Sequence, residues 1–142
     1  MPDNVLVAFD GSPLSERALT YALETFPAAS ITALYVINPV TSILDVEAGG
    51  LPVAEDWYEN AQDRAQRILT TATDLAAGHD VDVGTATEVG KPARAIIEYV
   101  HDHGVDQIVM GSHGRSGLDR TLLGSVAETV TRRARIPVTI IG

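Results

Sequence analysis

The chain of 142 residues contains no cysteine, which excludes a disulfide framework, thiol catalysis and a zinc–thiolate site. Aromatic residues make up only 5%, so the core must consist mainly of alanine, valine, leucine and isoleucine. No apolar run is long enough to cross a membrane, and the first residues lack the basic start of a signal peptide. We therefore expect a cytoplasmic protein with one domain, residues 1–142, and one sizeable core.

Positive charge is also scarce, because 19 aspartates and glutamates face only 10 basic residues, of which Lys91 is the one lysine. The formal net charge of −9 argues against binding to nucleic acid or to an anionic membrane surface. An acidic, lysine-poor composition resembles that of proteins from salt-loving organisms. The charge is uneven, since residues 111–142 carry five arginines against two carboxylates and have a net charge of +3.

Apolar segments alternate with segments of helical periodicity along the whole chain. The expected strands are residues 5–9, 31–37, 81–89, 107–110 and 138–141. Helical spacing of apolar residues fills the intervals between them, and prolines and glycines mark the helix ends. This order predicts an α/β fold, an open five-stranded parallel sheet with helices on both faces. The third strand is the least apolar and is expected near an edge.

The carboxyl ends of the predicted strands carry the candidate site, because open parallel sheets bind ligands at that edge, at the topological switch point. Asp10 follows the first strand, Val36 lies at the end of the second, and Gly111 follows the fourth. Asp10 is followed by a turn in which Ser12 is a natural N-cap and Pro13 suits the first helical position. The site is therefore expected where these three chain segments meet.

A glycine-rich segment begins at Gly111 and continues with Gly114, Gly124 and Ser125. Two residues separate the first pair of glycines, and nine separate Gly114 from Gly124. Such a loop before a helix lets backbone N–H groups face an anion. It has neither the lysine of a Walker A motif nor the Gly-x-Gly-x-x-Gly of a dinucleotide-binding fold. From spacing alone, the alternative is a long turn whose glycines only satisfy positive φ.

Histidines suggest other chemistry less strongly. His113 lies within the glycine-rich segment, but no spacing singles out a nucleophile and an orienting partner for it. It is expected to fix local backbone structure, with contact to a phosphate as the alternative. His101 and His103 are two residues apart and do not share a helix face, so no metal site is predicted. We identify no catalytic residue.

The combination of Gly-x2-Gly-x9-Gly-Ser with the segment from Phe9 to Ser12 and the pair Pro137-Val138 resembles the universal stress protein family. The resemblance covers essentially the whole chain and points to the subgroup that binds ATP. It implies a Rossmann-like sheet of the adenine nucleotide alpha hydrolase kind, with strand order 3-2-1-4-5. Ala8 departs from relatives that have a proline two residues before the aspartate, which should alter only packing near the nucleoside.

The resemblance also implies roles for individual residues. Asp10 would accept hydrogen bonds from the ribose or the adenine, and Val36 would contact the adenine. The sugar would be lined by Met110 and Gly111, and the triphosphate would be held by Gly114, Gly124, Ser125 and Val126, with Arg115 as a further phosphate contact. An Mg or Mn ion would accompany ATP, coordinated mostly by phosphates and water.

The function implied is that of an ATP-binding universal stress protein, a nucleotide-responsive regulator with little or no intrinsic hydrolysis. One alternative is a slow ATPase or nucleotidyl-transferase on the same fold. Another is a dimeric scaffold that binds an unknown protein partner without nucleotide. A homodimer is expected through the terminal strand Val138–Ile141, which is apolar and would lie at a sheet edge unless paired.

Overall fold

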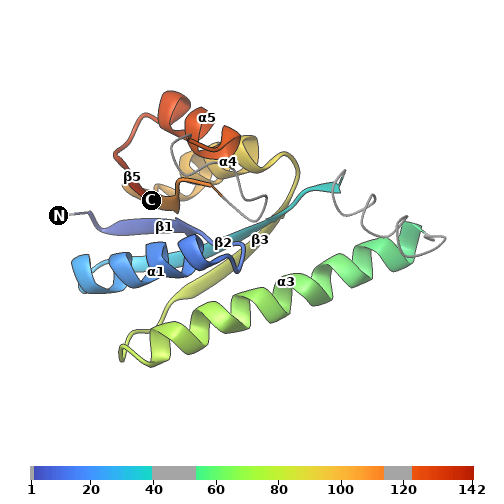
Figure 1. Ribbon diagram of the computed structural model, residues 1–142, viewed down its shortest axis with the longest axis horizontal. Coiled ribbons are helices and arrows are strands. Elements are labelled where there is room, and N and C mark those ends of the chain that lie inside the picture. Colours follow the sequence, from blue (N-terminus) through green and yellow to red (C-terminus); the bar gives the residue numbers. More distant parts are fainter. Residues whose placement is uncertain (1, 40–53, 114–122) are drawn as a thin grey trace.

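The computed structural model describes residues 2–39, 54–113 and 123–142, with side chains from residue 57 onward in the second range. Strands and helices alternate along the chain (Figure 1). The elements are β1 (Asn4–Ala8), α1 (Pro13–Thr25), β2 (Ser30–Ile37), α3 (Ala54–Ala77), β3 (Gly84–Val89), α4 (Pro92–His103), β4 (Gln107–Gly111), α5 (Ser125–Arg133) and β5 (Val138–Ile141).

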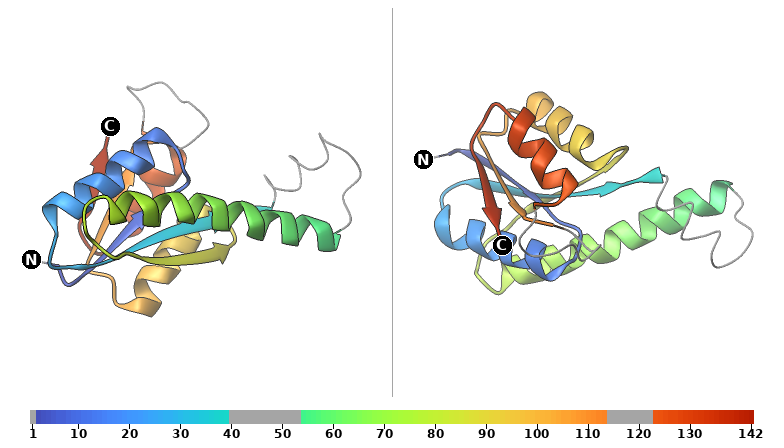
Figure 2. Two further views of the ribbon diagram at one scale, coloured as in Figure 1. Left: turned by 90° about the horizontal axis from the view of Figure 1, so that it is seen from below. Right: turned by 45° about the horizontal axis from the view of Figure 1, so that its top comes forward.

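The strands form one five-stranded sheet in the order β3-β2-β1-β4-β5, and every neighbouring pair is parallel. The predicted fold class and strand order are confirmed. Helices α1 and α3 cover one face of the sheet, and α4 and α5 cover the other (Figures 1 and 2). This follows from right-handed crossovers, which place helices on opposite faces when the strand order reverses.

The sheet is buried on both faces, which explains the nearly continuous apolar runs of its central strands. Val5, Val7 and Phe9 pack with α1 and α3 in one core cluster. Leu6, from the same strand, packs with α4 and α5 in a second cluster on the other face. Alternate residues of β1 therefore belong to separate cores, as the two-residue period of a strand requires.

The third strand begins at Gly84 rather than at residue 81, where the sequence pattern placed its start. The backbone N–H of Val81 donates to the Ala76 carbonyl at the end of α3, so this residue is still part of the helix termination. Asp80, just before it, has a φ of 58°. Val81 and Val83 nevertheless pack against the core, which explains why their apolar side chains resembled part of a strand.

Helix ends follow the signals in the sequence. Ser12 caps α1 by accepting a hydrogen bond from the Ser15 backbone N–H at 3.2 Å, and Pro13 is the first helical residue. Gly104 ends α4 in the left-handed conformation, with a φ of 63°. His79 and His103 each bring Nδ1 to 3.1 Å from a backbone carbonyl four residues earlier, in the last turns of α3 and α4. Within the described residues, no helix is long and apolar enough to cross a membrane.

Candidate functional site

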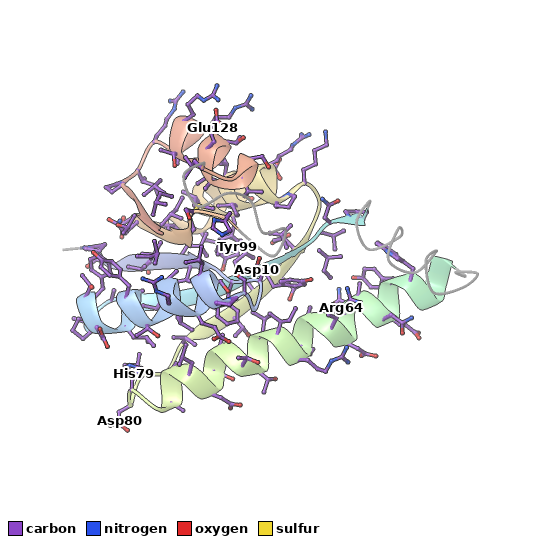
Figure 3. The ribbon with its side chains drawn as sticks, viewed as in Figure 1. Asp10, Arg64, His79, Asp80, Tyr99 and Glu128 are labelled. Atoms are coloured by element: carbon purple, nitrogen blue, oxygen red, sulfur yellow. The ribbon has the colours of Figure 1, made fainter. Side chains whose placement is uncertain are left out.

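The topological switch point lies between β1 and β4. From β1 the chain passes through α1 to β2 on one side of the sheet, whereas β4 pairs with the other edge of β1. The connections that leave β1 and β4 therefore diverge at the carboxyl edge. Asp10 follows β1, Gly111 ends β4, and Asp10 lies near the middle of the molecule in Figure 3. The structure thus places the predicted site at the position that binds ligands in folds of this kind.

Apolar residues from three elements meet beside this edge. Val36 of β2, Met110 of β4 and Val126 of α5 belong to the core cluster on the α4 and α5 face. Ala8 of β1 packs against the same cluster. Met110 is buried, whereas Val36 and Val126 are half-buried. The predicted nucleoside contacts Val36 and Met110 and the predicted phosphate contact Val126 therefore share one face of the sheet, although they are far apart in the sequence.

Asp10 holds the turn that connects β1 to α1. Its Oδ1 accepts a hydrogen bond from the Ser12 backbone N–H at 2.9 Å, across Gly11, whose φ of 80° favours glycine. This is an Asx turn, which fixes the carboxylate relative to the sheet. The second oxygen, Oδ2, has no hydrogen bond to any described residue.

The first turn of α5 lies at the same edge, and no side chain of a described residue caps its N-terminus. Gly124 is the N-cap and offers no side-chain acceptor, in contrast to Ser12 at the start of α1. Ser125 is the first helical residue and is exposed. The N–H groups of a first helical turn lack intrahelical acceptors and carry the positive end of the helix dipole. The start of α5 therefore suits an anion, while the start of α1 is already capped.

The two described glycines of the motif are required by packing. A Cβ atom on Gly111 would lie 2.8 Å from the Leu14 Cβ atom, so the glycine lets α1 approach β4. A Cβ atom on Gly124 would lie 3.0 Å from the Ser112 carbonyl oxygen and 3.1 Å from His113 Cα. The resemblance implies that Gly111 lines the sugar, and the structure shows in addition that α1 packs beside it. Gly124 brings the start of α5 against the end of β4.

Ser112 links three elements, a role that the sequence did not indicate. Its backbone N–H donates to the Ile141 carbonyl of β5 at 2.8 Å, and its carbonyl accepts the Gly124 N–H at 2.6 Å. Its buried hydroxyl lies 3.2 Å from His113 Nδ1. The partners are distant in sequence or are backbone atoms, so no residue pattern could reveal them. The Ser112 contact agrees with the expectation that His113 stabilises local structure.

Two predicted site residues, Gly114 and Arg115, lie outside the described residues. Within the described part of the chain, no group of three or more histidine, aspartate or glutamate side chains could hold a metal ion.

Comparison with known proteins identifies the family. The sequence model of the universal stress protein family matches residues 1–142. The universal stress protein YxiE of Bacillus subtilis is 32% identical over 147 residues, which cover 99% of this chain and 99% of that protein. The universal stress protein MJ0531 of Methanocaldococcus jannaschii is also 32% identical over 142 residues, covering 96% of this chain and 80% of that protein. The chain therefore belongs to the universal stress protein family.

Solved structures agree with this assignment. The structure of MJ0577, a universal stress protein of Methanocaldococcus jannaschii, aligns with a TM-score of 0.80 and 28% identity over 98% of this chain and 94% of that chain. A universal stress protein in complex with cAMP aligns with a TM-score of 0.68 and 26% identity, covering 99% of this chain and 97% of that chain. Both the family and the order of the strands predicted from the sequence are confirmed.

Proposed function

We propose that this protein binds ATP at the carboxyl edge of its sheet and acts as a nucleotide-responsive regulator in a stress response. The adenosine would lie over Val36 and Met110, with Asp10 accepting a hydrogen bond from the ribose or the adenine. The phosphates would extend to Gly124, Ser125 and Val126 at the start of α5. Gly114 and Arg115 complete the proposed set from the sequence motif.

The observation that carries this proposal is the open N-terminus of α5 beside an apolar surface. Backbone N–H groups and the helix dipole bind phosphate without any side chain. Val36 and Met110 belong to the same apolar cluster as Val126, the second residue of that helix, and offer contact to a flat base. A relative of similar fold has been solved in complex with cAMP, which supports an adenine nucleotide as the ligand.

A divalent ion, Mg or Mn, would come with ATP rather than be held by the protein alone. Asp10 is the carboxylate among the described residues of the proposed site. Its Oδ2, which has no hydrogen bond to a described residue, would contact such an ion or a ribose hydroxyl. Phosphoryl transfer requires a positioned metal-binding carboxylate and a group that orients the nucleophile. The described site residues offer Asp10 for the first role and nothing for the second, which favours sensing of ATP over its hydrolysis.

We further propose a homodimer that forms through β5. This strand lies at the edge of the sheet, and all four of its residues, Val138–Ile141, are half-buried in the single chain. An apolar edge strand exposes unpaired backbone groups, and pairing with a second copy satisfies them. The cytoplasmic location stays a prediction from the sequence.

The proposal is tested by asking whether nucleotide accompanies the protein through purification. The protein is denatured with acid, and the supernatant is separated by anion-exchange chromatography with adenine nucleotide standards. We expect ATP, in an amount that falls strongly in the Gly124→Val variant. Absence of every adenine nucleotide from protein purified without a chelator, together with failure to take up added Mg-ATP, would refute the proposal.

A further inference from the structure

A cleft lies between α1 and α3, on the face of the sheet opposite α4 and α5. Its volume is about 360 Å³, and it is lined by Gly11, Glu16, Arg64, Arg67, Ile68 and Thr71. Small-molecule sites commonly start at about 300 Å³. In Figure 2 the helices α1 and α3 lie side by side over the sheet, and Figure 3 marks Arg64 along α3. None of the residues proposed to contact ATP lines this cleft.

The charge of the cleft is opposite to that of the whole protein. Arg64 and Arg67 are three residues apart on α3 and therefore lie on neighbouring turns of the same side. The protein has only 10 basic residues against 19 acidic ones, so two arginines in one small cleft stand out. Glu16 of α1 is the one carboxylate in the lining, and it forms no ion pair with a described residue. Arg67 likewise has no ion pair with a described residue.

The remaining lining residues suit a small organic anion. Ile68 supplies a buried apolar surface at the base of the cleft. The Thr71 hydroxyl donates to the Arg67 carbonyl at 3.3 Å, which leaves its oxygen as an acceptor for a ligand hydroxyl. The start of α1 contributes no anion site, because the Ser15 N–H is taken by the Ser12 side chain and the Glu16 N–H by the Ser12 carbonyl. Recognition of an anion here depends on the guanidinium groups.

We propose that this cleft binds a small molecule that carries a phosphate or pyrophosphate group, at a site separate from the proposed ATP site. Guanidinium groups bind phosphate oxygens through paired N–H donors, with geometry that lysine cannot reproduce. Arg64 and Arg67 would contact the anion, and Ile68 would contact the organic part of the ligand. The Glu16 carboxylate would repel the anion and so disfavour ligands of high negative charge. The ligand would lie against Gly11, one residue from Asp10, so the two sites share the turn after β1.

The test uses the full chain labelled with nitrogen-15, titrated with inorganic pyrophosphate while amide and arginine Nε signals are recorded by NMR. We expect saturable shifts at Gly11, Arg67 and Thr71. Arg67→Gln should weaken this response about tenfold, because the amide cannot replace the charge-assisted hydrogen bonds of the guanidinium group. Glu16→Gln should strengthen it severalfold, since the replacement removes a like charge from the cleft.

Arg94→Gln is the matched control, because it removes the same charge from α4 on the opposite face. It should leave the pyrophosphate response unchanged. Equal weakening by Arg94→Gln and Arg67→Gln would overturn the proposal, since it would show only general attraction to positive charge. Shifts that fail to saturate at Gly11, Arg67 and Thr71 would overturn it as well.

Repeating the titration with Mg-ATP present separates this inference from the proposed ATP site. Pyrophosphate can also bind at the start of α5, where shifts would appear at Gly124 and Val126. The proposal requires that the shifts at Arg67 and Thr71 persist when the α5 signals no longer respond. If Mg-ATP itself removes the response at Arg67 and Thr71, the cleft is part of the nucleotide site and the separate-site proposal is wrong.

Discussion

The backbone N–H of Gly124 donates to the Ser112 carbonyl at 2.6 Å, which joins the start of α5 directly to the end of β4. This contact places the uncapped end of the helix at the carboxyl edge of the sheet. No side chain at position 124 fits without displacing backbone atoms of residues 112 and 113. The glycine therefore sets where a phosphate can meet the helix.

Replacement of Gly124 by alanine should weaken ATP binding by at least tenfold. The new Cβ atom would press on the Ser112 carbonyl and His113 Cα, and the strain should lower the free energy of unfolding by about 1–3 kcal/mol. Calorimetry of ATP binding and urea denaturation measure the two effects. Gly78→Ala is the control, because its Cβ would lie in ordinary contact, 3.4 Å from the Leu75 carbonyl oxygen and 3.9 Å from that of Asp74. Unchanged ATP affinity in Gly124→Ala would contradict the assigned role.

Replacement of Gly111 by alanine should mainly lower the free energy of unfolding. The added Cβ would lie 2.8 Å from Leu14 Cβ, so α1 must move away from β4, at a cost of about 1–3 kcal/mol. Gly84→Ala in β3 is the matched control, since its nearest neighbour, the Thr32 hydroxyl, is 3.4 Å away. Urea denaturation should show a clear loss for Gly111→Ala and little change for Gly84→Ala. Equal stability of the two variants would show that α1 does not require a glycine there.

The two carboxylate oxygens of Asp10 should have different roles: Oδ1 stabilises the turn, and Oδ2 binds ATP. Asp10→Asn keeps an oxygen that can accept the Ser12 N–H, so stability should change by less than about 0.5 kcal/mol. The same variant loses the negative charge and should bind ATP about tenfold more weakly, because hydrogen bonds to ionised groups are about twice as strong as neutral ones. Asp10→Ala should lose both stability and affinity. Full ATP affinity in Asp10→Asn would show that the carboxylate does not contribute to ATP binding.

The N-cap of α1 should contribute about 1 kcal/mol to stability, the usual value for a serine cap replaced by alanine. Ser12→Ala removes the acceptor of the Ser15 N–H, and urea denaturation should detect the loss. Ser12→Gly should lower the free energy of unfolding by only about a few tenths of a kcal/mol, because glycine is a tolerated N-cap. If alanine and glycine at this position were equally destabilising, the cost would reflect lost packing of the buried side chain instead of the cap.

The proposed dimer should be visible in its mass. Light scattering is expected to give about twice the chain mass of 15.1 kDa, with dissociation on dilution if the β5 edge alone holds the copies together. A single-chain mass at every concentration would exclude pairing through Val138–Ile141.

Local signals predicted most of the fold. Ser12, Pro13 and Gly104 mark helix ends by mechanisms that act within a few residues, and the structure confirms each of them. The predicted start of β3 at residue 81 was wrong. The Val81 side chain packs against the core, but its backbone N–H still donates to the end of α3. Periodicity indicates that a side chain is buried, but it does not indicate which carbonyl accepts the backbone N–H of that residue.

The site could be predicted only in part. The expectation that Asp10, Val36 and Gly111 lie together follows from the rule that ligands bind beyond the carboxyl ends of parallel strands, whereas Met110 was implied only by the family resemblance. The contacts of Ser112 with Ile141 and Gly124 depend on backbone atoms that no residue type signals. Arg64 and Arg67 were not singled out, because arginines on an amphipathic helix resemble an ordinary solvated face until α1 is seen beside them.

ATP binding at the carboxyl edge of the sheet is tested most directly by calorimetric titration of the purified protein, freed of nucleotide, with ATP in the presence of Mg²⁺. AMP and cAMP serve as comparison ligands, and Gly124→Ala serves as the impaired variant. We expect saturable binding of one ATP per chain, tighter than that of cAMP, because only a chain of phosphates can use the whole first turn of α5. No heat of binding at millimolar ATP would contradict the proposed ATP site.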